Sequence, residues 1–208
     1  IFKAEGIRYT TAEAALTRGN IWARLKGGDK PALVLLNHMD VVPADAIYWD
    51  EDPLSGAVRD GKIYGRGTLD DKDSVTAGLM LLLMLERENI ELERDVIFLA
   101  EAGEEGTPEV GVDFMVNEHW DEIAAEYCLA EGGGAVASEG TVRYVSIATT
   151  EKFPMRVRLL AEGTAGHGSV PRVDNAISAL ARAVSRLSDW QPPMRLNDTT
   201  RAYFERLA

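Results

Sequence analysis

The chain has 208 residues, 46% of them hydrophobic, which is enough to bury a sizeable core and does not match the composition of a disordered protein. Its formal net charge of -12 disfavours nucleic acid and anionic membranes as partners, because both are negatively charged. The single cysteine, Cys128, excludes an intrachain disulfide and a cysteine-based zinc knuckle, and its apolar neighbours favour a small core residue.

Targeting signals are not evident in the sequence. The first residues lack the basic and apolar pattern of a signal peptide, and the longest apolar run, residues 75–85, is too short to cross a bilayer. We therefore expect a cytoplasmic protein without membrane association.

The first predicted elements surround a long loop. Residues 11–18 fit a short helix, and the apolar run 32–36 predicts a strand that is covered on both faces. Residues 41–68 are rich in Pro, Gly and Asp and predict an irregular loop with a small hairpin around residues 60–61. Loops of this length inside a compact domain are usually functional.

Helices and strands then alternate. We predict a helix over 74–88, a buried strand over 96–99, a helix over 109–120 and a third buried strand over 127–130. Such alternation is typical of an α/β fold with a mostly parallel sheet.

The pattern changes near residue 149. Residues 153–159 alternate partly between apolar and basic side chains, as in a half-exposed strand, and an amphipathic helix follows with Asp174 as its N-cap. We therefore predict a core over 1–148 and the beginning of a second domain over 149–208.

Candidate metal ligands follow each predicted buried strand. They are, in chain order, His38 with Asp40, Glu104 with Glu105, and Glu131. Open α/β sheets bind ligands at the carboxyl ends of their strands, so these side chains are expected to converge. Imidazole and carboxylate donors without thiolates suit zinc, with cobalt or manganese also open. Considered alone, His38 and Asp40 could equally be a surface pair in a loop.

Asp70 lies in a glycine-rich turn before a predicted helix. Its two carboxylate oxygens could bridge two metal ions, although an isolated turn of this kind is more often a helix N-cap. Glu104 and Glu105 are adjacent and repel each other unless a cation or solvent screens them, so one could bind metal while the other takes up a proton. The conjunction of these features predicts a metal site.

Four motifs in this order and spacing resemble the M20 family of metallopeptidases and aminoacylases: NHMDVVP, DGKIYGRGTLDDK, EAGEEG and LAEGGG. The stretch 49–72 is most similar to the carboxypeptidase and N-acyl amino acid hydrolase branch, and the likeness extends over about residues 10–190. The resemblance implies a three-layer αβα zinc-peptidase-like core, followed by the start of an α+β lid domain through which the chain forms a homo-oligomer.

The resemblance also implies a ligand set for two zinc ions. His38, Asp70 and Glu131 would bind the first zinc, Asp70 would bridge to the second, and Glu105 would bind the second. The peptide bond between Asp70 and Asp71 would be cis. The family's second zinc takes a further His that nothing in this sequence matches, so one or two zinc ions are expected here.

Catalytic roles follow from the same resemblance. Asp40 would orient His38, Glu104 would be the general base, and His167 in the GTAGHGSVP motif would stabilise the oxyanion from a partner subunit. Without the resemblance, His167 would be taken for a turn histidine, and His119 matches no family ligand and is expected on the surface or in packing.

The implied reaction is hydrolysis of an amide next to a free carboxylate, with a small peptide or N-acyl amino acid as substrate. Compared with the family, the sequence stops within the lid, starts abruptly, and has Asp73 after Lys72 where Gly is usual. The alternative is therefore a truncated, non-catalytic remnant that folds and binds one metal without turnover.

Overall fold

The computed structural model describes residues 1–153 and 155–207. Its contacts divide the chain into two units, Ile1–Gly132 and Gly133–Ala208. The candidate ligands predicted from the strand ends all lie in the first unit, and the GTAGHGSVP motif lies in the second.

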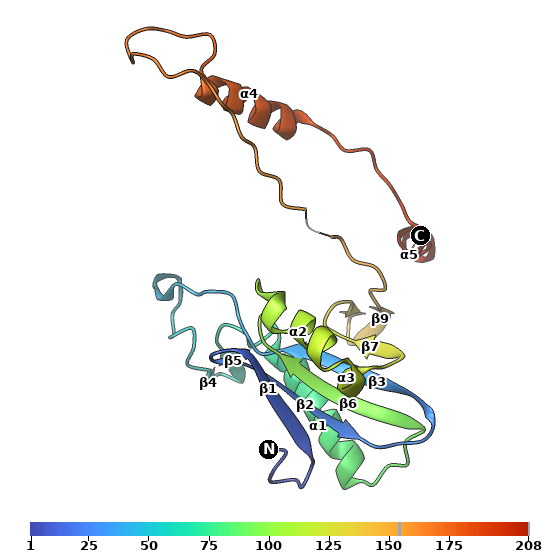
Figure 1. Ribbon diagram of the computed structural model, residues 1–208. Helices are drawn as coiled ribbons and strands as arrows, with labels where there is room; N and C mark the ends of the chain where they lie inside the picture. The colour runs from blue at the N-terminus through green and yellow to red at the C-terminus, as the bar shows by residue number, and fades with distance from the viewer. Residues whose placement is uncertain (154, 208) are drawn as a thin grey trace. The chain divides into compact units, whose positions relative to one another are not determined.

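The first unit is built on a five-stranded sheet with the strand order β1-β2-β6-β3-β7 (Figure 1). Strands β3 and β6 are parallel, as are β3 and β7, whereas β2 pairs antiparallel with both β1 and β6. The α/β class is therefore confirmed, and the parallel part of the sheet consists of β6, β3 and β7. The strands are β1 (Tyr9–Ala15), β2 (Arg18–Leu25), β3 (Lys30–His38), β6 (Arg94–Glu101) and β7 (Tyr127–Leu129).

Helices cover both faces of this sheet and make a three-layer arrangement (Figure 1). On one face, Leu82 and Leu83 of α1 (Lys72–Arg87) pack with Phe98. On the other, Met115 of α2 (Val112–Glu118) and Ile123 of α3 (Trp120–Ile123) pack with Ile97 and its neighbours. Successive strand residues point to opposite faces, so a continuous apolar run can fill two cores at once.

The loop between β3 and α1 carries the expected hairpin. Strand β4 (Ala57–Arg59) pairs antiparallel with β5 (Lys62–Tyr64), and Asp60 and Gly61 between them have φ of 52° and 73°. Positive φ at both central residues is the signature of the two-residue turn that matches the twist of a hairpin. A short 3-10 helix, η1 (Ala46–Tyr48), precedes it.

Two predicted elements of the first unit differ from the structure. The helix expected over 11–18 is wrong, because residues 9–15 form β1 and pair in register with β2. Pairing with a neighbouring strand overrides the helical propensity of the Ala and Glu residues there. The helix expected over 109–120 is divided into η2 (Pro108–Val110), α2 and α3.

Strand β7 forms where it was expected, but its side chains are exposed. Within the described sheet it is one of the two edge strands and pairs only with β3. Cys128 is accordingly exposed, so the prediction of a core cysteine is wrong.

The regular structure in the described residues of the second unit is one hairpin and two helices. Strand β8 (Gly134–Ser138) pairs with β9 (Thr141–Ser146), and the helices are α4 (Ala176–Asp189) and α5 (Asp198–Leu207). Residues 153 and 155–159 form no strand, contrary to expectation, and Pro154 of that stretch lies outside the described residues. Ladder hydrogen bonds need a partner strand, and none pairs with residues 153 and 155–159 in the described chain.

The helix predicted after Asp174 is confirmed, but its cap is one residue later. The side chain of Asn175 accepts a hydrogen bond from the Ser178 N–H at 3.1 Å, while Arg172 holds the Asp174 carboxylate at 2.8 Å. Asn caps a helix as well as Asp does, because its side-chain oxygen reaches the same N–H groups. Across the two described segments, no helix combines the length and apolarity needed to span a bilayer.

An ion-pair network stabilises the end of the sheet where β6 begins. Oδ2 of Asp95 accepts from Arg24 at 2.8 Å and from Lys26 at 2.9 Å, and its Oδ1 accepts from the Gly27 N–H at 2.9 Å. Burial raises the pKa of Asp95, but these donors outweigh it and lower the pKa to about 2. The network therefore favours the folded chain whenever Asp95 is ionised.

Replacing Asp95→Asn is expected to lower the free energy of unfolding by about 1–2 kcal/mol at pH 7, because charge-assisted hydrogen bonds are lost. The folded pKa lies below the ordinary value of 3.8, so the contribution is complete above that value and disappears as pH falls through about 2. Urea unfolding at pH 7 and at pH 3 measures both effects. The matched control is Glu93→Gln at the exposed Lys30 pair, with an expected change within about 0.5 kcal/mol. Equal losses in the two variants would contradict the assignment.

Candidate metal centre

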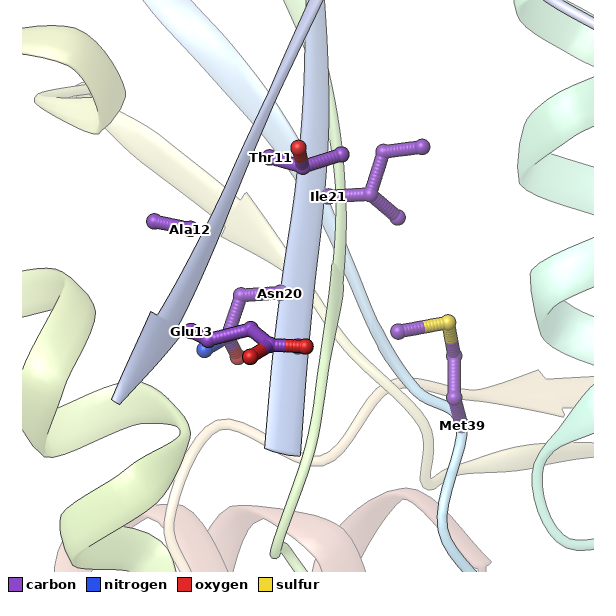
Figure 2. Close-up of a pocket in the computed structure, with 7 residues that line it drawn as sticks. Thr11, Ala12, Glu13, Asn20, Ile21 and Met39 are labelled. Atoms are coloured by element: carbon purple, nitrogen blue, oxygen red, sulfur yellow. The ribbon is translucent and has the colours of Figure 1, made fainter. Parts of the chain in front are cut away.

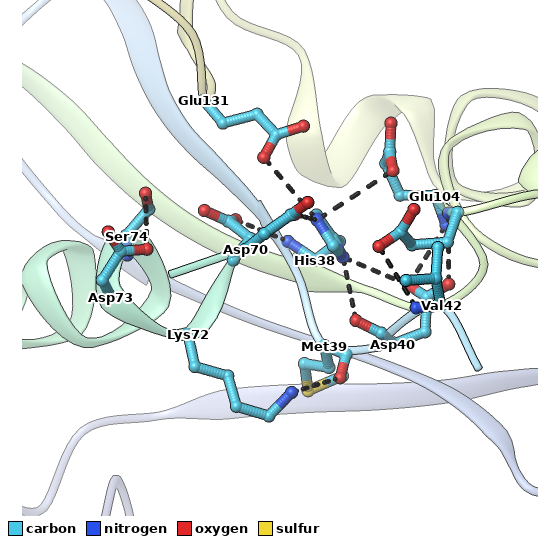
Figure 3. Close-up of polar contacts among 12 residues, drawn as sticks. His38, Met39, Asp40, Val42, Asp70, Lys72, Asp73, Ser74, Glu104 and Glu131 are labelled. Atoms are coloured by element: carbon cyan, nitrogen blue, oxygen red, sulfur yellow. Dashed lines mark hydrogen bonds and ion pairs between the residues drawn. The ribbon is translucent and has the colours of Figure 1, made fainter. Parts of the chain in front are cut away.

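His38 is the buried centre of the candidate site. It is the last residue of β3, with a side chain only 2% exposed, and its Nε2 lies 2.9 Å from Oδ1 of Asp70 (Figure 3). The His38 N–H donates to Oδ2 of Asp71 at 3.1 Å, and its Nδ1 lies 3.1 Å from the backbone carbonyl oxygen of Asp40. These contacts fix the ring, so one nitrogen faces the acidic side chains.

The parallel pairing of β3 with β6 sets the place of this histidine. The last pair in their register is His38 with Glu101, and the Met39 N–H donates to the Glu101 carbonyl at 2.8 Å. Both strands therefore end at the same level of the sheet. The loop after β6, which carries Glu104 and Glu105, emerges beside the loop after β3.

Asp40 connects these two loops. Its Oδ1 accepts the Glu104 N–H and its Oδ2 accepts the Glu105 N–H, both at 3.2 Å, while Oδ1 lies 3.4 Å from Nδ1 of His38. The Val42 N–H in turn donates to Oε1 of Glu105 at 3.2 Å. Asp40 thus contacts His38 as its spacing predicts, but its hydrogen bonds hold the backbone of the acidic pair.

The side chains form two overlapping groups that could hold a divalent cation. One consists of His38, Asp70 and Glu105, and the other of His38, Asp71 and Glu131, with the donor atoms of each group within 4.8 Å of one another. Glu131 also places Oε2 3.6 Å from Nε2 of His38 (Figure 3). One imidazole with several carboxylates is a donor set that fits zinc and also suits manganese or cobalt.

Four of the residues predicted as metal ligands are brought together, namely His38, Asp70, Glu105 and Glu131. The predicted base Glu104 borders them, with Oε2 4.0 Å from Nε2 of His38. The N-cap alternative for Asp70 is wrong, since Asp71 occupies the N-cap position of α1 and makes no side-chain capping bond.

The two other histidines lie elsewhere. His167 belongs to an exposed loop of the second unit, with Nδ1 2.8 Å from Oγ of Ser169, and is not among the side chains that the first unit gathers. His119 packs against the rings of Trp22 and Phe114 and contacts Glu122 at 2.9 Å, which confirms a packing and surface role.

Asp71 belongs to the site, although the sequence did not predict a role for it. It is 1% exposed, holds the His38 N–H and is part of the second ligand group. Its position beside Asp70 in the TLDDK stretch was the available signal. The peptide bond between the two residues is cis, as the family resemblance implies.

Glu101 is the other acidic residue without a predicted role. Its side chain is 3% exposed and its Oε2 has no hydrogen-bond partner. Burial, then the charges of Glu104 and Asp40, raise its pKa to about 7. A carboxyl group enclosed at the end of a strand can be stored in its neutral form, which lowers the charge that the site must accommodate.

The site places several carboxyl groups close to one imidazole, and these groups shift one another's pKa. Burial lowers the pKa of His38, but the hydrogen bond to Asp70 and the charge of Glu131 outweigh it, so the pKa is raised. Burial raises the pKa of Glu104 and of Glu131, although the charge of His38 opposes both shifts. A divalent cation would relieve this repulsion and displace the proton from the imidazole.

Comparison with known proteins identifies a family and several relatives. The model of peptidase family M20/M25/M40 matches residues 34–200. The human N-fatty-acyl-amino acid synthase/hydrolase PM20D1 is 38% identical over 176 residues, which is 80% of this chain and 34% of the relative. A probable carboxypeptidase S-like 2 of Dictyostelium discoideum is 35% identical over 186 residues, 86% of this chain and 36% of the relative.

Solved structures support the same conclusion about the fold. The M20 family metallo-carboxypeptidase Sso-CP2 from Sulfolobus solfataricus gives a TM-score of 0.55 at 27% identity, over 64% of this chain and 30% of that one. Human carnosine dipeptidase 1 gives 0.52 at 25% identity, over 64% and 32%. The chain spans about a third of the length of these proteins. Because the family model matches most of the sequence, the chain belongs to peptidase family M20/M25/M40.

Proposed function

We propose that this chain carries the metal centre of a zinc-dependent hydrolase that cleaves an amide bond next to a free carboxylate. The proposed substrate is a small peptide or an N-acyl amino acid. The observation that carries the proposal is the convergence of the His38 imidazole with the carboxylates of Asp70, Glu105 and Glu131. The names of the relatives, an N-fatty-acyl-amino acid synthase/hydrolase and a carboxypeptidase, support this substrate class.

The proposed ligand assignment divides the cluster between two zinc positions. His38 and Glu131 would hold the first zinc, Glu105 would hold the second, and Asp70 would serve both. Asp70 suits the shared role because it is the more exposed of the two adjacent aspartates, whereas Oδ2 of Asp71 already accepts the His38 N–H. A bound divalent cation supplies Lewis-acid polarisation of the substrate carbonyl and a lowered pKa for water.

Glu104 is the proposed proton carrier. Its carboxyl group borders the ligands without belonging to either group, and burial raises its pKa. A carboxylate with a raised pKa takes up a proton more readily, so Glu104 can accept a proton from the attacking water and then deliver it to the leaving nitrogen as the C–N bond breaks. The two hydrogen bonds that the Asp40 carboxylate accepts from the Glu104 and Glu105 N–H groups hold Glu104 beside the ligands.

Residues 149–208 are proposed to serve as part of a lid that contributes to a homo-oligomer. His167 is the proposed donor to the oxyanion, supplied from a partner subunit. Its loop is exposed, as are the apolar side chains of Ile177, Val184 and Leu187 on α4. Such an apolar face is compatible with a further contact surface.

The role of His38 predicts metal binding that is coupled to proton release. The carboxylates raise the pKa of His38, so the metal-free site retains a proton that the metal must displace, and apparent affinity falls as pH falls through that pKa. Calorimetric titration with Zn²⁺ in buffers of different ionisation enthalpy measures the released protons.

His38→Gln is expected to weaken Zn²⁺ binding by more than about 100-fold, since even the loss of outer-shell partners costs 10–100-fold. His119→Gln is the matched control, because His119 is an imidazole outside the cluster, and it should bind like the unmodified chain. Unchanged binding by the His38 variant would refute the proposed centre.

The role of Glu104 predicts a separation of turnover from metal content. Glu104→Gln should lower hydrolysis by about 10²–10⁴-fold, the usual contribution of general acid–base catalysis, with metal content unchanged. A survey of dipeptides and N-acyl amino acids, with and without a chelator, provides the assay. Glu118→Gln, at an exposed position of α2, is the control.

Turnover that survives Glu104→Gln would refute the proposed base. A metal-loaded chain that hydrolyses none of these substrates would instead support the alternative, a remnant that binds metal without turnover.

A further inference from the structure

Asn20 of β2 is a buried polar residue, and its side-chain amide bonds to both ends of one loop. Its side chain is 1% exposed. Oδ1 accepts the Ala102 N–H at 3.0 Å, and Nδ2 donates to the Val110 carbonyl at 2.9 Å. Figure 2 shows Asn20 on β2, beside Glu13 of β1.

The loop that Asn20 contacts is the one that carries Glu104 and Glu105. The loop begins at Ala102, directly after β6, and ends with η2 at Val110. The two hydrogen bonds of Asn20 therefore join its first and last residues. Loops of this length with adjacent ends are compact units, and functional residues are often found in them.

The closure of the loop is tight. A Cβ atom on Gly111 would lie 2.0 Å from the carbonyl oxygen of Ala102 and 2.5 Å from Oε2 of Glu101, so only glycine fits where the loop returns. Asn20 supplies a donor and an acceptor at this point, where the backbone of Ala102 is buried and that of Val110 is partly buried. Without it, a buried N–H and a carbonyl would both lose their partners.

We propose that Asn20 is a positioning residue that closes this loop and thereby fixes Glu104 and Glu105 beside His38. This inference rests on the proposed metal centre. The amide acts through the loop backbone, because its hydrogen bonds go to Ala102 and Val110 and it belongs to neither group of candidate metal ligands. It works with Asp40, which follows β3 and accepts hydrogen bonds from the Glu104 and Glu105 N–H groups.

A purely structural asparagine would make different contacts. Asn37, which is also buried, donates to the carbonyls of Leu35 and Leu99 within strands and holds no loop. Both polar atoms of the Asn20 amide instead bond to the ends of one acidic loop. Its loss should therefore disturb the loop and the metal centre more than the rest of the sheet.

The first test is amide hydrogen exchange on the metal-free chain. In Asn20→Ala the Ala102 amide should exchange about tenfold faster, because its acceptor is lost, and the amides of Thr107 and Gly111 should follow. The amides within β3 should keep their protection. The matched control is Leu25→Ala, a core truncation at the other end of β2, which should leave the loop protected.

The second test is calorimetric titration of the same variants with Zn²⁺. Asn20→Ala should bind about 10–100-fold more weakly than the unmodified chain, the loss typical of residues that hold metal ligands in place. Leu25→Ala should retain its affinity. Faster loop exchange with unchanged affinity, or unchanged loop exchange, would overturn the proposal.

Failure of Zn²⁺ binding and failure of the variant to fold lead to different conclusions. If the unmodified chain binds no Zn²⁺, the proposed function fails and the positioning role fails with it, while exchange still reports whether Asn20 closes the loop. If Asn20→Ala does not fold, Asn20→Leu replaces it, since Leu has a similar volume and removes both the acceptor for Ala102 and the donor to Val110. That variant should lose protection at the Ala102 and Gly111 amides, and protection of both amides would overturn the proposal.

Discussion

The parallel pairing of β3 with β6 is the constraint on which the site depends. Their register ends at His38 and Glu101, so the loops that leave the two strands start side by side. Parallel strands place successive carboxyl ends at one edge of a sheet, which lets residues far apart in sequence converge. Burial of both faces of these strands against α1, α2 and α3 keeps that register from slipping, because a shift by one residue would exchange the two cores.

The convergence of these side chains brings electrostatic repulsion between carboxylates. A nearly fully buried imidazole is surrounded by carboxylates, and the pKa shifts in the cluster reflect burial, neighbouring charges and, for His38, the hydrogen bond to Asp70. The metal-free chain can lower this repulsion by holding protons, and a divalent cation would lower it further. The same crowding that destabilises the metal-free site therefore favours metal binding, which is why a cluster of this kind is informative about function.

Much of the site could be predicted from the sequence because its signals are local. The apolar runs at 32–36 and 96–99 mark the buried strands, and the polar residues that end them mark the rim of the sheet. The strand β1 could not be predicted in this way, since its conformation depends on pairing with β2 rather than on its own propensity. Asn20 was missed because a single polar residue in a strand gives no pattern, and its partners are 82 and 90 positions away.

The stabilising ion pairs and the candidate metal site lie at opposite ends of β6. Strand β6 begins beside the charges that hold Asp95 and ends at Glu101, where the acidic loop emerges. At its beginning, each negative charge has cationic partners, and ionisation favours folding. At its end, the negative charges face one another, and ionisation opposes folding until a cation is present. The fold can carry an unfavourable cluster at the rim because the far end of the sheet and the two apolar layers stabilise the strands that present it.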